Sequence, residues 1–175
     1  MLNDSFLYQV LFLLHLTAVI VGFGSAFVYP VLASKARKLG PKEAYAVNHT
    51  AFSISRYLTT YPIYAAGAFG LALVFASENA EVLFKQRWIS IAFFLFILAV
   101  LVELFLFYPN AKAMDALAEK LANATPGQDG EPAGKPKEVA ELEERGSKAG
   151  MYGGMLHLFF FLLMIDMIWK PGSLV

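Results

Sequence analysis

The chain has 175 residues, of which 58% are hydrophobic and only 16% are charged. A soluble domain of this length is normally much less apolar. The formal net charge is zero, so the composition gives no reason to expect a nucleic-acid partner. Because the chain contains no cysteine, disulfides, thiolate metal sites, iron–sulfur clusters and covalently attached c-type haem are excluded.

Four long apolar stretches predict four helices that cross a membrane. Each stretch reaches the length of about 20 residues that a helix needs to span the hydrocarbon. Their hydrophobicity is continuous rather than alternating, which favours helices over a β-barrel. We therefore predict an all-α fold, a single integral membrane domain built as a four-transmembrane-helix bundle with cytoplasmic helical extensions. The predicted spans are residues 6–32, 57–76, 88–108 and 150–169.

The distribution of Lys and Arg predicts the orientation. The first and third connections carry eleven of these residues, whereas the termini and the second connection carry three. By the positive-inside rule both termini lie outside and the two longer connections are cytoplasmic. The first apolar stretch has no preceding Lys or Arg and is longer than the apolar region of a signal peptide, roughly 7–15 residues. We interpret it as a retained helix of a protein in the bacterial inner membrane.

Glycine and proline predict where the helices begin and end. Gly40 and Pro41 predict the end of the first helix and the start of the second. Pro62 predicts a kink in the second helix. The third helix is predicted to end near Tyr108, where Pro109 starts a new one. The two halves of the chain are alike in layout, but they show no matching residues.

A cytoplasmic helical hairpin is predicted over residues 110–149, between the third and fourth spans. Apolar stripes on both sides of a segment rich in Gly and Pro favour two helical arms. The segment itself, residues 125–137, has the composition of a flexible turn. An unstructured charged loop is the alternative.

Four ionisable residues fall within the spans, where charge is costly and function is the default hypothesis: His15, Glu103, His157 and Asp166. Counted at 1.5 Å per residue from the outer helix ends, His15 lies about 13 Å deep and His157 about 18 Å deep. The two histidines are thus expected within one helical turn of each other in depth. If their helices are neighbours, the two imidazoles flank one haem iron.

Small residues next to both histidines agree with a planar cofactor. Gly150, Gly153 and Gly154 share a helical face with His157, and Gly22 shares one with His15. Arg56, at the inner end of the second helix, is predicted to contact a haem propionate. The cofactor predicted from these residues is haem b, with His15 and His157 as ligands of the iron.

Each of these residues also has a purely structural interpretation. Small residues four apart, such as Gly146, Gly150 and Gly154, are the ordinary contacts of membrane helices. For Glu103 we favour an ion pair with Arg56 over a proton relay with His157. Asp166 is expected to be solvated or paired near the outer interface.

The run HLTAVIVGFGSAFVYPVLASKARK, from His15 to Lys38, resembles the first helix of HemJ-type proteins, which are linked to protoporphyrinogen oxidation. His15, Ala18, Phe27 and Pro30 fit the layout of that helix, and the ending MIWKPG is also similar. The resemblance implies that His15 is a b-haem ligand. The whole chain is more similar to an uncharacterised family of predicted four-helix integral membrane proteins. HemJ-type proteins carry a basic residue in the third helix, whereas residues 88–108 here contain none.

The leading hypothesis is an integral membrane protein that binds b-type haem, in electron transfer or haem-related redox chemistry. Two imidazole ligands leave no open position on the iron, which favours electron transfer over oxygen chemistry and argues against an enzyme. The alternative is a non-catalytic structural or accessory subunit of a larger membrane complex. A third hypothesis is a porphyrinogen-oxidising enzyme. The expected partners are the lipid bilayer and other membrane subunits or further copies of the chain.

Overall fold

The computed structural model describes residues 6–77, 80–123 and 137–171. In these ranges every regular element is a helix, and four continuous helices are long and apolar enough to cross a membrane. This confirms the predicted fold class. The predicted flexible turn lies, apart from Lys137, outside the described residues. The elements are α1 (Phe6–Ala26), α2 (Val28–Ala36), α3 (Pro41–Ser55), the π-helical turn η1 (Arg56–Thr60), α4 (Tyr61–Ala76), α5 (Ala80–Phe84), α6 (Arg87–Val102), the π-helical turn η2 (Glu103–Phe107), α7 (Tyr108–Asn123) and α8 (Lys137–Trp169).

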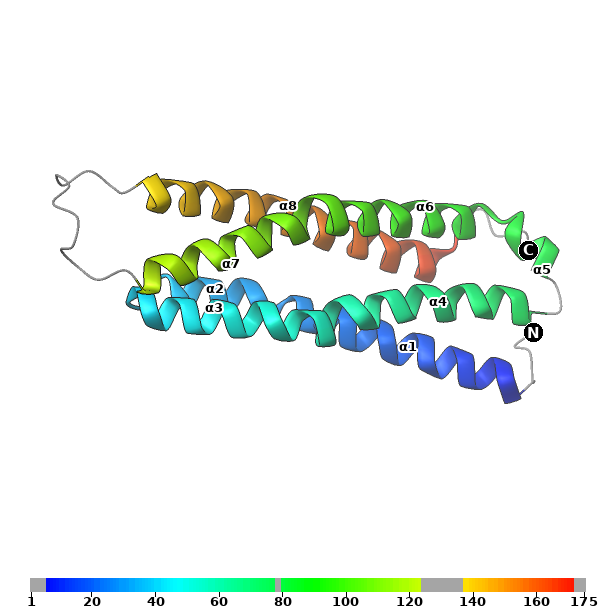
Figure 1. Ribbon diagram of the computed structural model, residues 1–175. Coiled ribbons are helices and arrows are strands. Elements are labelled where there is room, and N and C mark those ends of the chain that lie inside the picture. Colours follow the sequence, from blue (N-terminus) through cyan, green and yellow to red (C-terminus); the bar gives the residue numbers. More distant parts are fainter. Residues whose placement is uncertain (1–5, 78–79, 124–136, 172–175) are drawn as a thin grey trace, which may run out of the picture.

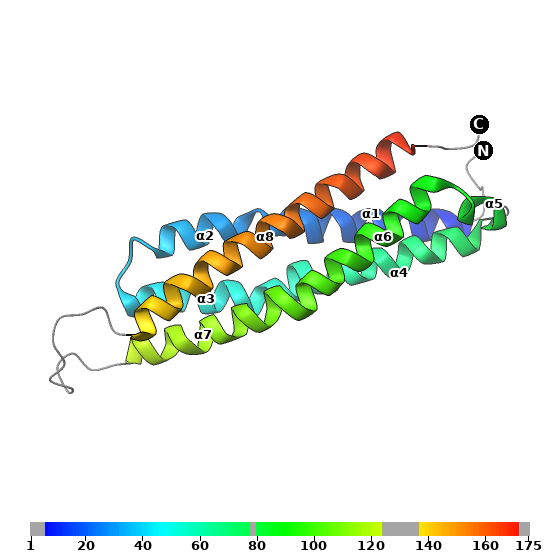
Figure 2. The ribbon, with the colours of Figure 1, turned by 90° about the horizontal axis from the view of Figure 1, so that it is seen from above.

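The long helices form an elongated bundle (Figures 1 and 2). The first helix consists of α1 and α2, and the second of α3, η1 and α4. The third consists of α6, η2 and α7, and the fourth is α8. At one end, which we call the terminal end, α1 begins and α8 ends, and there α1 packs along α4 and α6 along α8. At the opposite end, the basic end, α2 packs on α3, α3 on α7, and α7 on α8.

The surface and the core have the composition expected of a protein in lipid. Large apolar side chains cover the outside, and Phe6, Phe105 and Trp169 are each at least 70% exposed. Among the described residues, seven of the eleven buried apolar side chains are alanine. Small residues let helix backbones approach closely, which is the main source of packing where lipid removes the hydrophobic driving force. Water would disfavour such a surface, so it is the surface of a bilayer-embedded bundle.

Two glycines allow large side chains to pack between the helices. A Cβ atom placed on Gly22 of α1 would lie 2.8 Å from Ile63 Cγ1 and 3.2 Å from the Ile63 nitrogen. A Cβ atom on Gly67 of α4 would lie 2.3 Å from the Phe96 ring of α6. Gly22 therefore lets α1 approach α4, and Gly67 lets the aromatic ring of α6 enter between the two helical pairs.

Polar contacts join the helices at the basic end. His49 Nδ1 of α3 lies 2.9 Å from Asp115 Oδ2 of α7, and Lys120 Nζ lies 3.0 Å from Glu138 Oε1. The backbone N–H of Glu138 and the Lys120 ammonium lower the pKa of the Glu138 carboxyl. These pairs hold α3, α7 and the start of α8 together.

The sequence predicted that the third helix ends near Tyr108. In the structure it continues past this residue. The backbone widens into η2, where the Tyr108 N–H donates to the Glu103 carbonyl, and α7 follows without a gap. In the second helix the Tyr61 N–H donates to the Arg56 carbonyl in the same way. Proline lacks an N–H and clashes with the carbonyl four residues earlier. A π turn accommodates both effects and lets the helix continue.

Gly22→Ala is predicted to destabilise the protein, because the added methyl group must displace Ile63 or its backbone. Overpacking of this kind costs about 1–3 kcal/mol of unfolding free energy. The matched control is Gly24→Ala, two residues further along α1, where an added Cβ meets nothing within 4 Å. Thermal unfolding in detergent should show a lower midpoint for the first variant only. Equal midpoints for both variants would contradict the close approach of α1 and α4.

Candidate functional site

A polar cluster links the first two helices where proline has freed a carbonyl. Pro62 has no N–H to donate to the carbonyl of Leu58, four residues earlier. In the structure the Ser25 hydroxyl of α1 donates to this carbonyl at 2.8 Å. Ser25 Oγ also lies 2.6 Å from Thr59 Oγ1, which is 3.1 Å from the Tyr29 hydroxyl. Since an unsatisfied carbonyl is costly in lipid, this cluster fixes α1 against the second helix.

A second cluster joins the two π turns reciprocally. Arg56, at the start of η1, donates to the hydroxyl of Tyr108, just after η2, and its guanidinium lies 4.7 Å from the centre of the Tyr108 ring. Glu103, at the start of η2, accepts a hydrogen bond of 2.6 Å from Tyr64, just after η1. The predicted ion pair between Arg56 and Glu103 is wrong, because a tyrosine satisfies each charged group separately. We call Ser25, Tyr29, Thr59 and these two pairs the polar layer.

His15 lies on the packed face of α1, towards α4. Its Nδ1 is 2.8 Å from the Ala66 carbonyl oxygen, and its ring lies over Gly70, where an added Cβ would come within 3.2 Å of Cε1. A carbonyl oxygen only accepts, so Nδ1 carries the proton and Nε2 holds the lone pair. Direct packing on α4 thus closes the face that the sequence assigned to a cofactor.

His157, on α8, bonds a carbonyl of its own helix, and its other nitrogen has no partner among the described residues. Nδ1 lies 2.7 Å from the Gly153 carbonyl oxygen, so Nε2 again holds the lone pair. The ring packs edge-on against Phe27, with centroids 5.2 Å apart. Nε2 is buried and has no hydrogen-bond partner among the described residues. A backbone bond at one imidazole nitrogen orients the other, which is how protein histidines are prepared as metal ligands.

The structure does not bring His15 and His157 together. His157 contacts Phe27, which lies twelve residues after His15, about 18 Å along the helix axis. The Phe23 ring, near Phe27, packs on Phe160 in the same register. The predicted shared depth is wrong because it assumed that α1 and α8 end at the same level. Figure 1 shows that α1 reaches further towards the terminal end than α8 does.

The other predicted cofactor residues have separate environments. Gly22 is covered by the second helix, and Arg56 is held by Tyr108. Gly150 and Gly154 are exposed, and a Cβ atom on either would meet nothing within 4 Å. By helical spacing, both lie on the same side of α8 as His157.

Asp166 also differs from its sequence-based expectation. Its side chain is 4% exposed, and neither carboxyl oxygen finds a partner among the described residues. Within the described part of the chain it is therefore neither solvated nor paired. A buried carboxyl without a donor is costly, so α8 carries two unsatisfied polar groups, Nε2 of His157 and this carboxyl.

The polar layer is the part of the site that the sequence analysis missed. A Tyr–Pro pair marks each change of helix geometry: Tyr29–Pro30 after the break between α1 and α2, Tyr61–Pro62 after η1 and Tyr108–Pro109 after η2. In the last two, a charged residue stands five positions before the tyrosine. This spacing is visible in the sequence as a short internal repeat.

Four apolar helices of spanning length, a lipid-type surface and an alanine-rich core define an integral membrane protein of the four-helix class. The chain belongs to the family described as "Predicted integral membrane protein (DUF2269)", which it matches over residues 9–171. This confirms the family that the sequence indicated. Comparison with curated proteins and with solved structures gives no match.

Tyr64→Phe is predicted to destabilise the bundle, because it leaves Glu103 without its hydrogen-bond donor while the ring stays in place. Glu103 is partly buried, and the loss of unfolding free energy expected for an unsatisfied group of this kind is about 1–3 kcal/mol. Tyr61→Phe is the control, since the Tyr61 side chain makes a ring contact with Tyr57 and no hydrogen bond with a described residue. Thermal unfolding midpoints of both variants in detergent test the prediction. Similar midpoints would show that the hydrogen bond between Tyr64 and Glu103 does not stabilise the fold.

Proposed function

We propose that the protein is a membrane-embedded b-type haem protein that transfers electrons, with His157 as the ligand of the iron. The observation that carries the proposal is the buried, unpartnered Nε2 of His157, oriented by the hydrogen bond between Nδ1 and the Gly153 carbonyl. Neutral imidazole is a common ligand of haem iron. Leaving such a nitrogen unsatisfied is costly, and coordination would remove that cost.

The residues around His157 fit a planar group on one side. Gly150 and Gly154 lie seven and three residues before it on the same face, with open space where a side chain would stand. Phe27 offers an aromatic contact to the imidazole. Haem supplies one-electron chemistry when bound. The protein would contribute an oriented ligand, an apolar surrounding and glycines that let the ring approach the backbone.

His15 is left as a separate candidate ligand. Its Nε2 also holds a lone pair, but the separation from His157 along α1 excludes a single iron held by both histidines. Gly22 and Arg56 support helix packing and the polar layer, so they do not belong to the proposed site. With one protein ligand, the second axial position would be open or filled from outside this chain.

For the membrane, we propose the bacterial inner membrane, with both termini outside and the basic end in the cytoplasm. The support is the excess of Lys and Arg in the two connections at that end. The turn between α2 and α3, the end of α7 and the start of α8 lie at the same end of the bundle, which agrees with this orientation (Figure 1).

The second candidate function is a non-catalytic accessory subunit that assembles with another membrane helix. The favouring observation is the same glycine face of α8, because Gly146, Gly150 and Gly154 would each accept a side chain without contact. Glycines four residues apart are a common helix–helix contact in membranes. In this alternative, a hydrogen-bond donor on the partner helix would bond to Nε2 of His157.

An optical spectrum of the protein, purified in detergent from haem-replete cells, separates the two functions. Haem-b bands that sharpen on reduction by dithionite are expected in the wild type. They should be lost in His157→Ala, because the iron loses its ligand, and retained in the matched control His49→Ala, whose histidine faces Asp115 at the basic end. His15→Ala should retain them too.

Two results would count against the haem proposal. A colourless wild-type protein would favour the accessory subunit. Bands that survive in His157→Ala and vanish in His15→Ala would move the site to α1. Thermal unfolding of each variant shows whether a lost band reflects lost coordination or a lost fold.

A further inference from the structure

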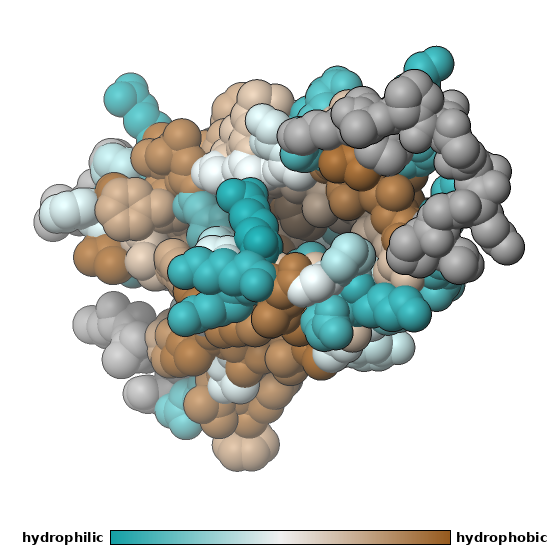
Figure 3. All heavy atoms as spheres, turned by 90° about the vertical axis from the view of Figure 1, so that its left-hand side faces the viewer, coloured by the Kyte–Doolittle hydropathy of each residue, from teal (hydrophilic) through white to brown (hydrophobic). Residues whose placement is uncertain are grey.

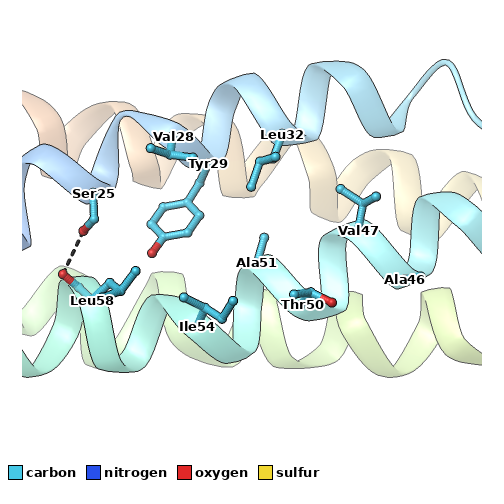
Figure 4. A pocket seen from close by; sticks show the side chains of 10 residues that line it. All are labelled: Ser25, Val28, Tyr29, Leu32, Ala46, Val47, Thr50, Ala51, Ile54 and Leu58. Carbon is cyan, nitrogen blue, oxygen red and sulfur yellow. Dashed lines mark hydrogen bonds between the residues drawn. The ribbon is translucent and has the colours of Figure 1, made fainter.

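A groove separates the first and second helices near the basic end. It has a volume of about 510 Å³ and lies between the end of the first helix and the middle of the second. Figure 4 shows Val28 and Leu32 on one wall and Val47 and Ile54 on the other, with the Tyr29 ring pointing across. The lining is mainly aliphatic, so the groove suits a hydrocarbon chain rather than a polar ligand.

Both walls of the groove lead to a lysine. Lys35 lies three residues after Leu32 and seven after Val28, on the same face of α2. Lys42 lies four residues before Ala46, which lines the opposite wall. Both lysines are exposed. The apolar groove therefore opens between two positive charges.

These charges belong to a basic cluster that has no ion-pair partner among the described residues. Lys35, Arg37, Lys38 and Lys42 surround the turn between α2 and α3, and none forms an ion pair with a described residue. By contrast, Lys120, Arg145 and Lys148 at the same end are each paired with a glutamate. Figure 3 looks onto this end and shows hydrophilic side chains gathered over it beside apolar surface.

The length of the groove matches the position of a phospholipid in one leaflet of the bilayer. From Ser25, at the deep end of the groove, to Lys35 the helix rises about 15 Å. The headgroup region adds roughly 5–8 Å to each side of the hydrocarbon. With the deep end in hydrocarbon, the lysines thus reach the level of the headgroups. Clusters of four or more basic residues at such a level attract anionic lipids.

We propose that this groove binds one anionic phospholipid of the cytoplasmic leaflet. One acyl chain lies between α2 and α3, and the phosphate contacts Lys35 and Lys42. The site is independent of haem binding, and it uses only the proposed orientation of the basic end. It would add one lipid-specific contact to the apolar outer surface of the bundle.

Native mass spectrometry of the detergent-purified protein, titrated with palmitoyl-oleoyl phosphatidylglycerol, tests the proposal. Phosphatidylcholine with the same chains tests the headgroup. Lys35→Gln/Lys42→Gln should weaken binding of the anionic lipid roughly thirtyfold, because each lysine near an anionic headgroup contributes about 1 kcal/mol. Lys112→Gln/Lys137→Gln removes the same charge from α7 and α8 and should change the affinity little.

The acyl chain is tested by Ala51→Phe, which fills the groove and leaves the charges in place. It should also weaken binding of phosphatidylglycerol. Equal affinities for the two headgroups, or equal losses in the two double-lysine variants, would reduce the site to non-specific surface charge and overturn the proposal. Unchanged binding in Ala51→Phe would show that no chain occupies the groove.

Discussion

The structure depends on how it satisfies the polar groups that proline leaves unpaired inside a membrane. Pro62 takes away the donor for the Leu58 carbonyl, and Ser25, on another helix, replaces it. In lipid no water can do so, which makes this contact a constraint on the position of α1 along α4. Arg56 and Glu103, each held by a tyrosine on the opposite helix, set the second helix against the third in the same way. The polar layer thus fixes the register of three helices.

This register determines which surfaces stay available for function. It closes the His15 and Gly22 faces by packing on the second helix, so the first helix contributes no open site there. On α8, in contrast, His157 keeps a buried nitrogen without a partner, and the neighbouring glycines border open space. Among the described residues, the buried side-chain polar atoms without a hydrogen-bond partner all belong to α8. At the basic end, the separation of α2 from α3 leaves the groove between two lysines.

The sequence predicted the features that depend on local pattern. The four spans follow from uninterrupted hydropathy, and α3 begins at Pro41 with Gly40 before it, as expected. The continuation through Pro109 could not be predicted from the usual meaning of proline as a helix stop, because a π turn accommodates it. The predicted depth of His157 relative to His15 was wrong, because counting residues from each helix end ignores how far one helix extends past another. The partner of Glu103, the burial of Asp166 and the groove between α2 and α3 depend on tertiary distances that no single stretch encodes.

The register of α1 against α8 is the central claim, and cross-linking tests it directly because the chain has no native cysteine. The Phe23 and Phe160 rings are 6.0 Å apart, so Phe23→Cys/Phe160→Cys should react efficiently with a short bifunctional maleimide in membranes. His15→Cys/His157→Cys should not, because these positions differ by about 18 Å along the bundle. Efficient cross-linking of the histidine positions, without cross-linking of the phenylalanine positions, would contradict the register and restore a site shared by both histidines.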